Sequence, residues 1–294
     1  TGNVHGFSQI FSNFVKEVTG YTVPVDVRRD LESGLQDCIV QLQQSFRFGI
    51  DSGIGAVGRA VNEGDGAQAI GLLRQVDYED IGWRDLPRAS GLPTALRRNI
   101  IDGFGAYLEE TAPGEIFQQF DRFRILCALR EGPYGVTALN SLVEDILVKH
   151  ELIEPDKRWY RGRPVMITRN DYNLRLFNGD VGIVLPDPDS GNDLRVFFPA
   201  PKGRLRKFHP QRLPEHETVY AMTVHKSQGS EFDRVLLLLP DRESRVLTRE
   251  LIYTAITRAR EGVETWGRAD VFQTAISRRM ERMSGLRDAL WGAN

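Results

Sequence analysis

A-M-T-V-H-K-S-Q-G-S-E-F-D, at residues 221–233, is the stretch that decides the fold of this chain. One strand is expected at Val219–Val224 and a second, buried strand at Arg234–Pro240, so the polar residues between them follow the end of a strand. Ligand sites in open α/β sheets lie beyond the carboxyl ends of the strands. We therefore expect a ligand-binding segment there, against the alternative of a polar loop that only covers a core strand.

The residue types in this segment suit a ligand that contains phosphate. His225 and Lys226 can donate to phosphate oxygens, and Glu231 can accept a hydrogen bond from a ribose hydroxyl. Gly229 has no side chain, so backbone at this position can approach a phosphate closely.

A second stretch, L-I-Y-T-A-I-T-R-A-R at residues 251–260, is expected to lie in a helix that runs from Thr248 to Arg260. Thr248 is a suitable N-cap, and the apolar residues recur with the spacing of a buried helix face. Arg258 then lies near the helix end, where a fixed guanidinium can stabilise the charge of a γ-phosphate. On a lone helix such an arginine is an ordinary surface residue, but the preceding segment favours the functional interpretation.

Strands and helices alternate on both sides of a region that has no helical period. Residues 161–214 contain short apolar runs broken by turn sequences such as N-G-D and P-D-P-D-S-G-N-D. Such a region predicts a small antiparallel barrel, inserted into one parallel α/β lobe. Further strands of the lobe are expected at Cys38–Phe48 and Phe123–Leu129.

The inserted region is basic although the chain as a whole is not. The 294 residues carry a formal charge of −2. Between Lys157 and Arg212 there are twelve Lys or Arg and five Asp or Glu, which gives this region a formal net charge of +7. The rest of the chain is therefore acidic. This distribution indicates contact with a polyanion, or else the solvated surface of a small domain.

The cysteines and the apolar runs indicate the cellular compartment of the protein. Cys38 and Cys127 stand among apolar residues and are expected to be buried thiols rather than a disulfide or a zinc site. The longest apolar run, Val235–Leu239, has the length of a buried strand and not that of a membrane span. A reducing, cytoplasmic location is therefore expected.

No G-x-x-x-x-G-K-[ST] sequence occurs in the 294 residues, and no apolar strand ending in Asp-Glu stands out. Such a loop of backbone N–H groups and a lysine is what cradles the β-phosphate of a nucleotide. We therefore expect this chain by itself to be inactive as an ATPase.

The two stretches, in this order, resemble motifs V and VI of superfamily 1 helicases, and their spelling resembles the RecD branch, which moves 5′ to 3′. L-Q-Q-S-F-R-F-G (42–49) looks like motif IV. R-P-V-M-I-T-R-N-D…L-F-N-G-D-V-G (163–182) looks like the start of the inserted Src-homology-3-like β-barrel of that branch. The similarity to the family of RecD subunits of exodeoxyribonuclease V, the RecBCD complex, runs from Leu42 to Gly285.

The resemblance implies a nucleotide site. Arg47 and Arg258 would act as paired arginine fingers on the γ-phosphate. The residues that would face the nucleotide are Gln228, Gly229 and Glu231. ATP and Mg²⁺ would be bound mainly by an absent first lobe, because this second RecA-like lobe, of the P-loop NTPase type, lacks the P-loop.

The resemblance also implies a DNA site and protein partners. Thr223 and His225 would touch the phosphodiester backbone of single-stranded DNA, and Lys226 could serve either the DNA or the nucleotide. Motors of this kind grip phosphate and sugar, so binding is expected to depend on salt and hardly on sequence. RecB-like and RecC-like subunits are the implied protein partners.

Four segments are expected along the chain. They are an N-terminal helical segment (1–35), the first part of the second RecA-like lobe (36–157), the inserted β-barrel (158–214) and the remainder of the lobe (215–294).

Two weaker constellations remain open. His209 and His216 have acidic neighbours, but they are expected to be loop residues and not a metal site. Trp159, Tyr160 and Phe208 stand among basic residues and either stack on bases or pack in the core of the barrel.

Together these features predict the C-terminal half of an ATP-dependent 5′-to-3′ DNA helicase subunit. It would act in double-strand break repair and recombination as part of a helicase–nuclease complex. Two alternatives stay open: a stand-alone RecD-like helicase, and a non-catalytic module that binds single-stranded nucleic acid.

Overall fold

The computed structural model describes residues 6–25, 36–38, 47–49, 51–154 and 157–280. The chain forms two units, which are Thr1–Phe48 with Glu281–Asn294, and Gly49–Met280. The first unit contains helix α1 (Gln9–Thr19), which begins after Ser8, whose hydroxyl accepts the N–H of Phe11. The helix ends at Gly20, whose φ of 77° closes the last turn.

The strand expected at Cys38–Phe48 falls largely on residues 39–46, outside the described residues. Before it, a 3-10 turn, η1 (Gln36–Cys38), contacts α1 through Asp37, which accepts hydrogen bonds from the backbone and the hydroxyl of Ser8. Cys38 lies at the surface end of this turn and is exposed, so the expectation of a buried thiol is wrong there. Cys127 is fully buried, and burial raises the pKa of its thiol to about 12.

The second unit is built on a five-stranded parallel sheet, as predicted for the lobe. Its strand order is β1-β10-β9-β2-β8. The strands are β1 (Ile81–Asp85), β2 (Phe123–Cys127), β8 (Ala221–Thr223), β9 (Phe232–Leu238) and β10 (Ala259–Gly267). The V-L-L-L run of β9 is buried on both sides, as a central strand of a parallel sheet requires.

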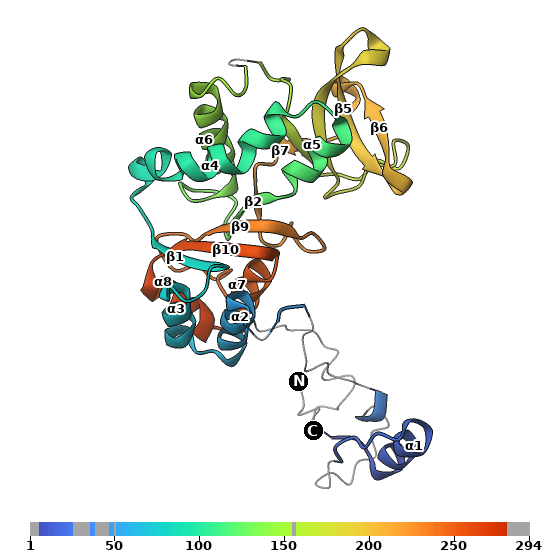
Figure 1. The fold of residues 1–294 in the computed structure, drawn as a ribbon, viewed down its shortest axis with the longest axis vertical. Coiled ribbons are helices and arrows are strands. Elements are labelled where there is room, and N and C mark those ends of the chain that lie inside the picture. Colours follow the sequence, from blue (N-terminus) through green and yellow to red (C-terminus); the bar gives the residue numbers. More distant parts are fainter. Residues whose placement is uncertain (1–5, 26–35, 39–46, 50, 155–156, 281–294) are drawn as a thin grey trace. The chain divides into compact units, whose positions relative to one another are not determined.

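Helices cover both faces of this sheet (Figure 1). On one face lie α4 (Leu92–Glu109), α5 (Pro113–Phe120) and α6 (Val136–Lys149). On the other face lie α2 (Gly53–Glu63), α3 (Gly66–Arg74), α7 (Arg249–Ile256) and α8 (Ala269–Ser277). The lobe is therefore a three-layer α/β sandwich.

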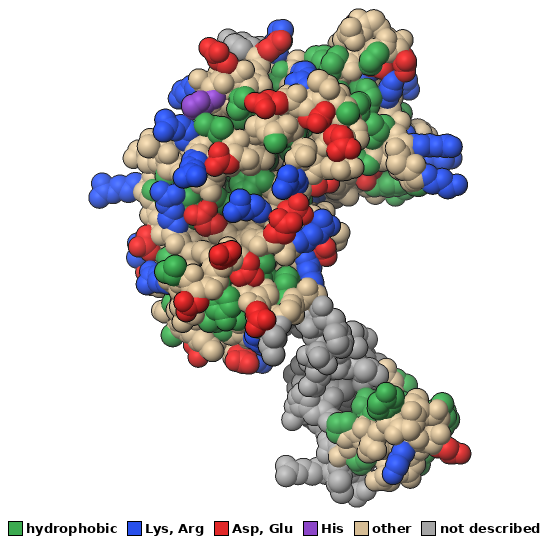
Figure 2. Space-filling view, viewed as in Figure 1, with side chains coloured by type: hydrophobic (Ala, Val, Ile, Leu, Met, Phe, Trp, Pro, Cys, Tyr) green, Lys and Arg blue, Asp and Glu red, His purple; other side chains and the backbone are tan. Residues whose placement is uncertain are grey.

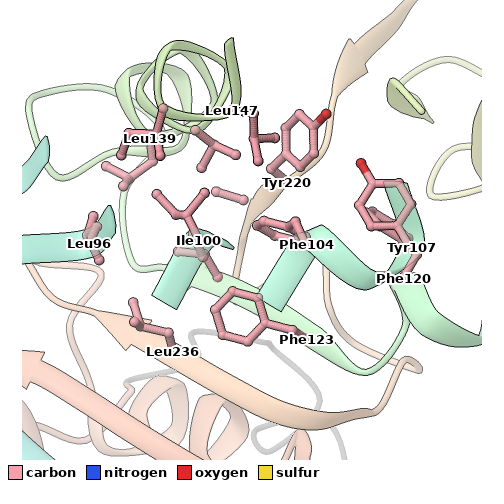
Figure 3. Close-up of a cluster of buried hydrophobic side chains, with 14 of the residues drawn as sticks. Leu96, Ile100, Phe104, Tyr107, Phe120, Phe123, Leu139, Leu147, Tyr220 and Leu236 are labelled. Atoms are coloured by element: carbon pink, nitrogen blue, oxygen red, sulfur yellow. The ribbon is translucent and has the colours of Figure 1, made fainter. Parts of the chain in front are cut away.

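The core between the sheet and α4–α6 combines aromatic and aliphatic side chains (Figure 3). Phe104 of α4 is fully buried, and its ring lies 5.1 Å from the rings of both Phe123 and Tyr220. Edge-to-face contacts of this kind stabilise the packing beyond the apolar area that they bury. They tie α4 to β2 and to the chain that enters β8.

Two elements differ from the expectation. The helix expected at Thr248–Arg260 ends at Ile256, because residues from Ala259 onward pair with β9 as strand β10. Thr257 marks the end of the helix, and its hydroxyl donates back to the Tyr253 carbonyl at 2.8 Å. Strand β1 is not predicted at all, since I-G-W-R-D is short and half polar, yet it pairs in parallel with β10.

The insert is an antiparallel sheet, as predicted, with strand order β6-β5-β4-β3-β7. Its strands are β3 (Pro164–Ile167), β4 (Val181–Asp187), β5 (Asp193–Ala200), β6 (Arg204–Phe208) and β7 (His216–Thr218). Strands β6 and β7 are its edges, and β7 lies past the expected boundary at residue 214. The sheet has its own core, made of Val165, Ile167, Leu176, Val184, Val196 and Phe198.

Asn140 of α6 fixes the edge strand β8. Its side-chain amide donates to the Ala221 carbonyl at 3.0 Å and accepts from the Ala221 N–H at 2.9 Å. Both groups are buried, so the amide replaces the neighbouring strand that β8 lacks on this side.

We predict that Asn140→Ala destabilises the chain by about 3 kcal/mol, because it leaves two buried backbone groups without a partner. The measurement is urea denaturation at neutral pH. Ser141→Ala, on an exposed position of the same helix, is the control and should change the free energy of unfolding by less than about 0.5 kcal/mol. Equal stability of the two variants would contradict this role of Asn140.

Candidate functional site

The connection from β8 to β9 runs from the carboxyl ends of the parallel strands to their amino ends. We call these two ends of the sheet the carboxyl edge and the amino edge. Thr223, the last residue of β8, pairs with Cys127 at the carboxyl end of β2. Phe232, the first residue of β9, pairs with Ala259 at the amino end of β10. A strand rises by about 3.3 Å per residue, so residues 224–231 span the roughly 20 Å length of β9.

This crossing corrects the expectation that the whole polar segment lies beyond the carboxyl ends of the strands. Thr223 ends β8, and His225 and Lys226 follow the carboxyl end of that strand. Glu231 immediately precedes β9 and Arg258 immediately precedes β10, so both lie at the amino edge. The connection must pass β2 and enter β9 in the same direction as β8. Its eight residues therefore have to run from the carboxyl edge to the amino edge.

Tight turns shape the connection. The N–H groups of Lys226 and Ser227 donate to the Thr223 carbonyl at 2.9 and 3.2 Å. Ser227 is fully buried, and its hydroxyl donates to the Val224 carbonyl at 2.8 Å. Gly229 has a φ of 88°, in the left-handed region that favours glycine. The buried Ser227 is a residue that the sequence analysis did not single out.

Cations and carboxylates meet at the amino edge. The Arg258 guanidinium donates to the Thr254 carbonyl through Nε (3.2 Å) and to the Ser230 carbonyl through Nη1 (3.1 Å). It thus joins the end of α7 to the connection. Arg260, on β10 and not on a helix, lies 3.2 Å from Glu231, and this hydrogen bond raises the pKa of Arg260.

Gln228, Gly229 and Glu231 are exposed, whereas Arg258 is half-buried. Arg47 belongs to the other unit, where its guanidinium lies 5.1 Å from the ring centre of Phe48. The pairing of Arg47 with Arg258 therefore stays a prediction.

Arg124 is a further residue that the sequence analysis missed. It is 1% exposed, its guanidinium lies 3.9 Å from the ring centre of Phe120, and Nη1 donates to the Val219 carbonyl at 2.8 Å. Burial lowers the pKa of Arg124 to about 10. It lines a cavity of about 330 Å³ together with Ser230 and Glu231. An arginine inside the apolar run F-R-I-L-C is the sequence signal that could have found it.

A second cleft, of about 740 Å³, lies at the carboxyl edge between the lobe and the insert. Lys226 lines it with Arg130, whose guanidinium lies 2.7 Å from Glu217, and with Arg158. Lys226 also donates to the side-chain carbonyl of Asn178 in the insert. Lys226, one of the residues expected to touch DNA, is therefore next to the inserted sheet.

The aromatic residues named as candidates for base stacking pack against protein groups. Tyr160 is buried, and its hydroxyl donates to Glu144 at 2.7 Å. The ring of Trp159 lies 5.2 Å from that of His216, and Phe208 lies edge-on to Phe198 at 5.8 Å. Core packing is the alternative that these contacts favour.

The charges of the insert are partly neutralised within it. Lys207 lies 2.6 Å from both Asp187 and Asp189. Figure 2 shows acidic and basic side chains intermixed over the α/β lobe, with basic side chains projecting from the insert. In the part of the chain that the structure describes, no cluster of three His, Cys, Asp or Glu could hold a metal ion.

Among the described helices, none combines the length and the apolar character needed to cross a bilayer.

Comparison with known proteins places this site in a family. The profile of the UvrD-like helicase C-terminal domain matches residues 218–263, which contain the β8–β9 connection and Arg258. The chain is 42% identical over 256 residues to the RecBCD enzyme subunit RecD of Mycobacterium tuberculosis, which covers 85% of the chain and 42% of that protein. It is 30% identical over 294 residues to the same subunit of Haemophilus influenzae, covering 93% of the chain and 44% of that protein.

Two further matches are more distant. An ATP-dependent RecD2 DNA helicase of Deinococcus radiodurans is 35% identical over 162 residues, or 54% of the chain and 22% of that protein. A crystal structure of Pif1 helicase from Bacteroides in complex with ADP-AlF3 and ssDNA is 17% identical, with a TM-score of 0.43 over 82% of the chain and 54% of that protein.

Residues 218–263 thus match a helicase C-terminal domain. The chain belongs to the RecD family, and it spans less than half the length of the RecD relatives that it matches.

We predict that His216 makes the stability of the chain depend on pH. Burial lowers the pKa of His216, and the charges of Arg163 and Arg158 lower it further, although a hydrogen bond with the Pro214 carbonyl opposes them. The unfolded chain then binds a proton below about pH 6.5 more readily than the folded chain. The free energy of unfolding should therefore fall as the pH drops below that value.

Urea denaturation at pH 7.5 and 5.5 checks this. His216→Gln should show a smaller loss of stability between the two pH values than the wild type. His150→Gln, at an exposed position after α6, should behave like the wild type. The same loss in the wild type and in His216→Gln would contradict the assignment.

Proposed function

We propose that the chain is part of an ATP-dependent 5′-to-3′ DNA helicase subunit, which acts in double-strand break repair and recombination within a cytoplasmic helicase–nuclease complex. RecB-like and RecC-like subunits would be its partners. The observation that carries this proposal is the β8–β9 connection, which puts Thr223 at one edge of the sheet and Glu231 at the other.

The amino edge suits one side of a nucleotide site. Gly229 has open space where a Cβ would be, so a phosphate could approach the backbone there. Arg258 is anchored through Nε and Nη1 to two backbone carbonyls, and a guanidinium fixed in this way suits the charge of a γ-phosphate. ATP would supply the free energy of each cycle. A first lobe outside this chain would bind Mg²⁺ and make most of the contacts with the phosphates.

The carboxyl edge suits the phosphodiester backbone of single-stranded DNA. His225 is exposed there, and Lys226 lies in the cleft between lobe and insert. Cations that line a cleft attract a polyanion independently of its sequence. The inserted sheet, which we take to be of the Src-homology-3-like barrel type, would form the opposite wall.

A test uses the full-length protein and this chain in parallel. The full-length protein should hydrolyse ATP when single-stranded DNA is present, and Arg258→Ala should lower kcat by roughly a thousandfold. Arg258→Lys should not restore it, because an ammonium cannot reproduce the planar guanidinium. Arg98→Ala, at a position 92% exposed on α4, is the matched control and should keep full turnover.

The chain by itself should show no turnover. ATP hydrolysis by this chain that is abolished by Arg258→Ala, or full turnover of the full-length Arg258→Ala variant, would contradict the proposal. Co-purification of RecB-like and RecC-like subunits separates a subunit of a complex from a stand-alone RecD-like helicase. DNA binding without any nucleotide dependence in the full-length protein would favour the non-catalytic alternative.

A further inference from the structure

Two aromatic side chains are exposed side by side on the loop between β3 and β4. Tyr172 is 76% exposed and Phe177 is 45% exposed. Their ring centres are 6.1 Å apart with an interplanar angle of 73°. Adjacent exposed rings mark a binding surface more often than single exposed apolar residues do.

The loop that carries them is held rigidly. Asp171 and Leu176 exchange backbone hydrogen bonds of 2.7 and 3.0 Å, and Leu176 is fully buried in the core of the insert. The Phe177 N–H donates to the Asp180 carboxylate at 2.8 Å. The rings are therefore presented by a fixed backbone, which reduces the entropy lost when a ligand binds.

The same loop contacts the segment expected to bind DNA. Asn178, the residue after Phe177, accepts a hydrogen bond from the Lys226 ammonium. Arg175 is exposed in the same turn, between the two aromatic residues. Rings next to cations are the arrangement with which proteins hold single strands, because bases stack on rings while phosphates meet the cations.

We propose that Tyr172 and Phe177 form a stacking platform for bases of the single strand whose phosphates contact Thr223, His225 and Lys226. The platform rests on the proposed function, since it requires a single strand at the carboxyl edge. It gives the inserted sheet a direct part in DNA binding, through stacking and not only through charge. Every base has a π-face, so the platform accepts any sequence.

The test compares two labelled probes of equal length, oligo-dT and the corresponding abasic oligodeoxynucleotide, by fluorescence anisotropy with the 294-residue chain at several salt concentrations. The wild type should bind oligo-dT more tightly than the abasic probe. The double variant Tyr172→Ala with Phe177→Ala should bind oligo-dT roughly tenfold more weakly, or weaker still, and the abasic probe as the wild type does. Its salt dependence should not change.

Two controls separate stacking from charge and from folding. Tyr172→Phe keeps the ring and should bind like the wild type. Lys226→Ala should weaken binding of both probes and reduce the slope of log K against log salt by about 0.7. Thermal unfolding of the double variant should match the wild type, because both side chains are largely exposed.

The outcomes are distinguishable. If the double variant binds both probes as the wild type does while Lys226→Ala weakens both, the DNA site stands and the platform is wrong; the rings would then be a contact for a protein partner. If the wild type binds neither probe, the DNA-binding part of the proposed function and the platform fall together.

Discussion

The eight-residue connection between β8 and β9 is the constraint on which the rest of the site depends. Because β8 and β9 are parallel and separated by β2, their connection must cross the whole length of the sheet. Asn140 fixes the start of this connection by pairing with Ala221, and Arg258 fixes its end by holding Ser230. The carboxyl edge and the amino edge are therefore linked by only eight residues of the chain.

The insert is joined to the lobe by a buried cluster of tyrosine hydroxyls. Tyr107 donates to the Gly162 carbonyl at 2.9 Å, and the hydroxyl oxygens of Tyr160 and Tyr220 are 3.2 Å apart. Burial raises the pKa of Tyr160, so its hydroxyl stays protonated and can donate to Glu144. These contacts hold the insert against α4 and α6, which preserves the cleft that Lys226 lines.

The class of fold and the antiparallel insert could be predicted from the sequence, because strand–helix alternation and turn-rich strands leave local patterns. The end of the sheet at which each site residue lies could not be predicted, since it depends on strand order. The whole polar segment was expected beyond the carboxyl ends of the strands, but Glu231 lies at the amino edge. The start of strand β10 was hidden because the helical spacing of 251–260 continues past the true end of α7 at Ile256. The role of Asn140 rests on a long-range contact with the backbone of Ala221 that no local pattern reports.

The most direct test of the account is the affinity of the full-length protein for a non-hydrolysable ATP analogue, measured with and without saturating single-stranded DNA. If the connection couples the two edges, DNA should change this affinity by about 5- to 150-fold, and the analogue should change the affinity for DNA by the same factor. Ser227→Ala, which removes the buried hydrogen bond to Val224, should bring the factor closer to one. Equal nucleotide affinity with and without DNA in the wild type would contradict the account.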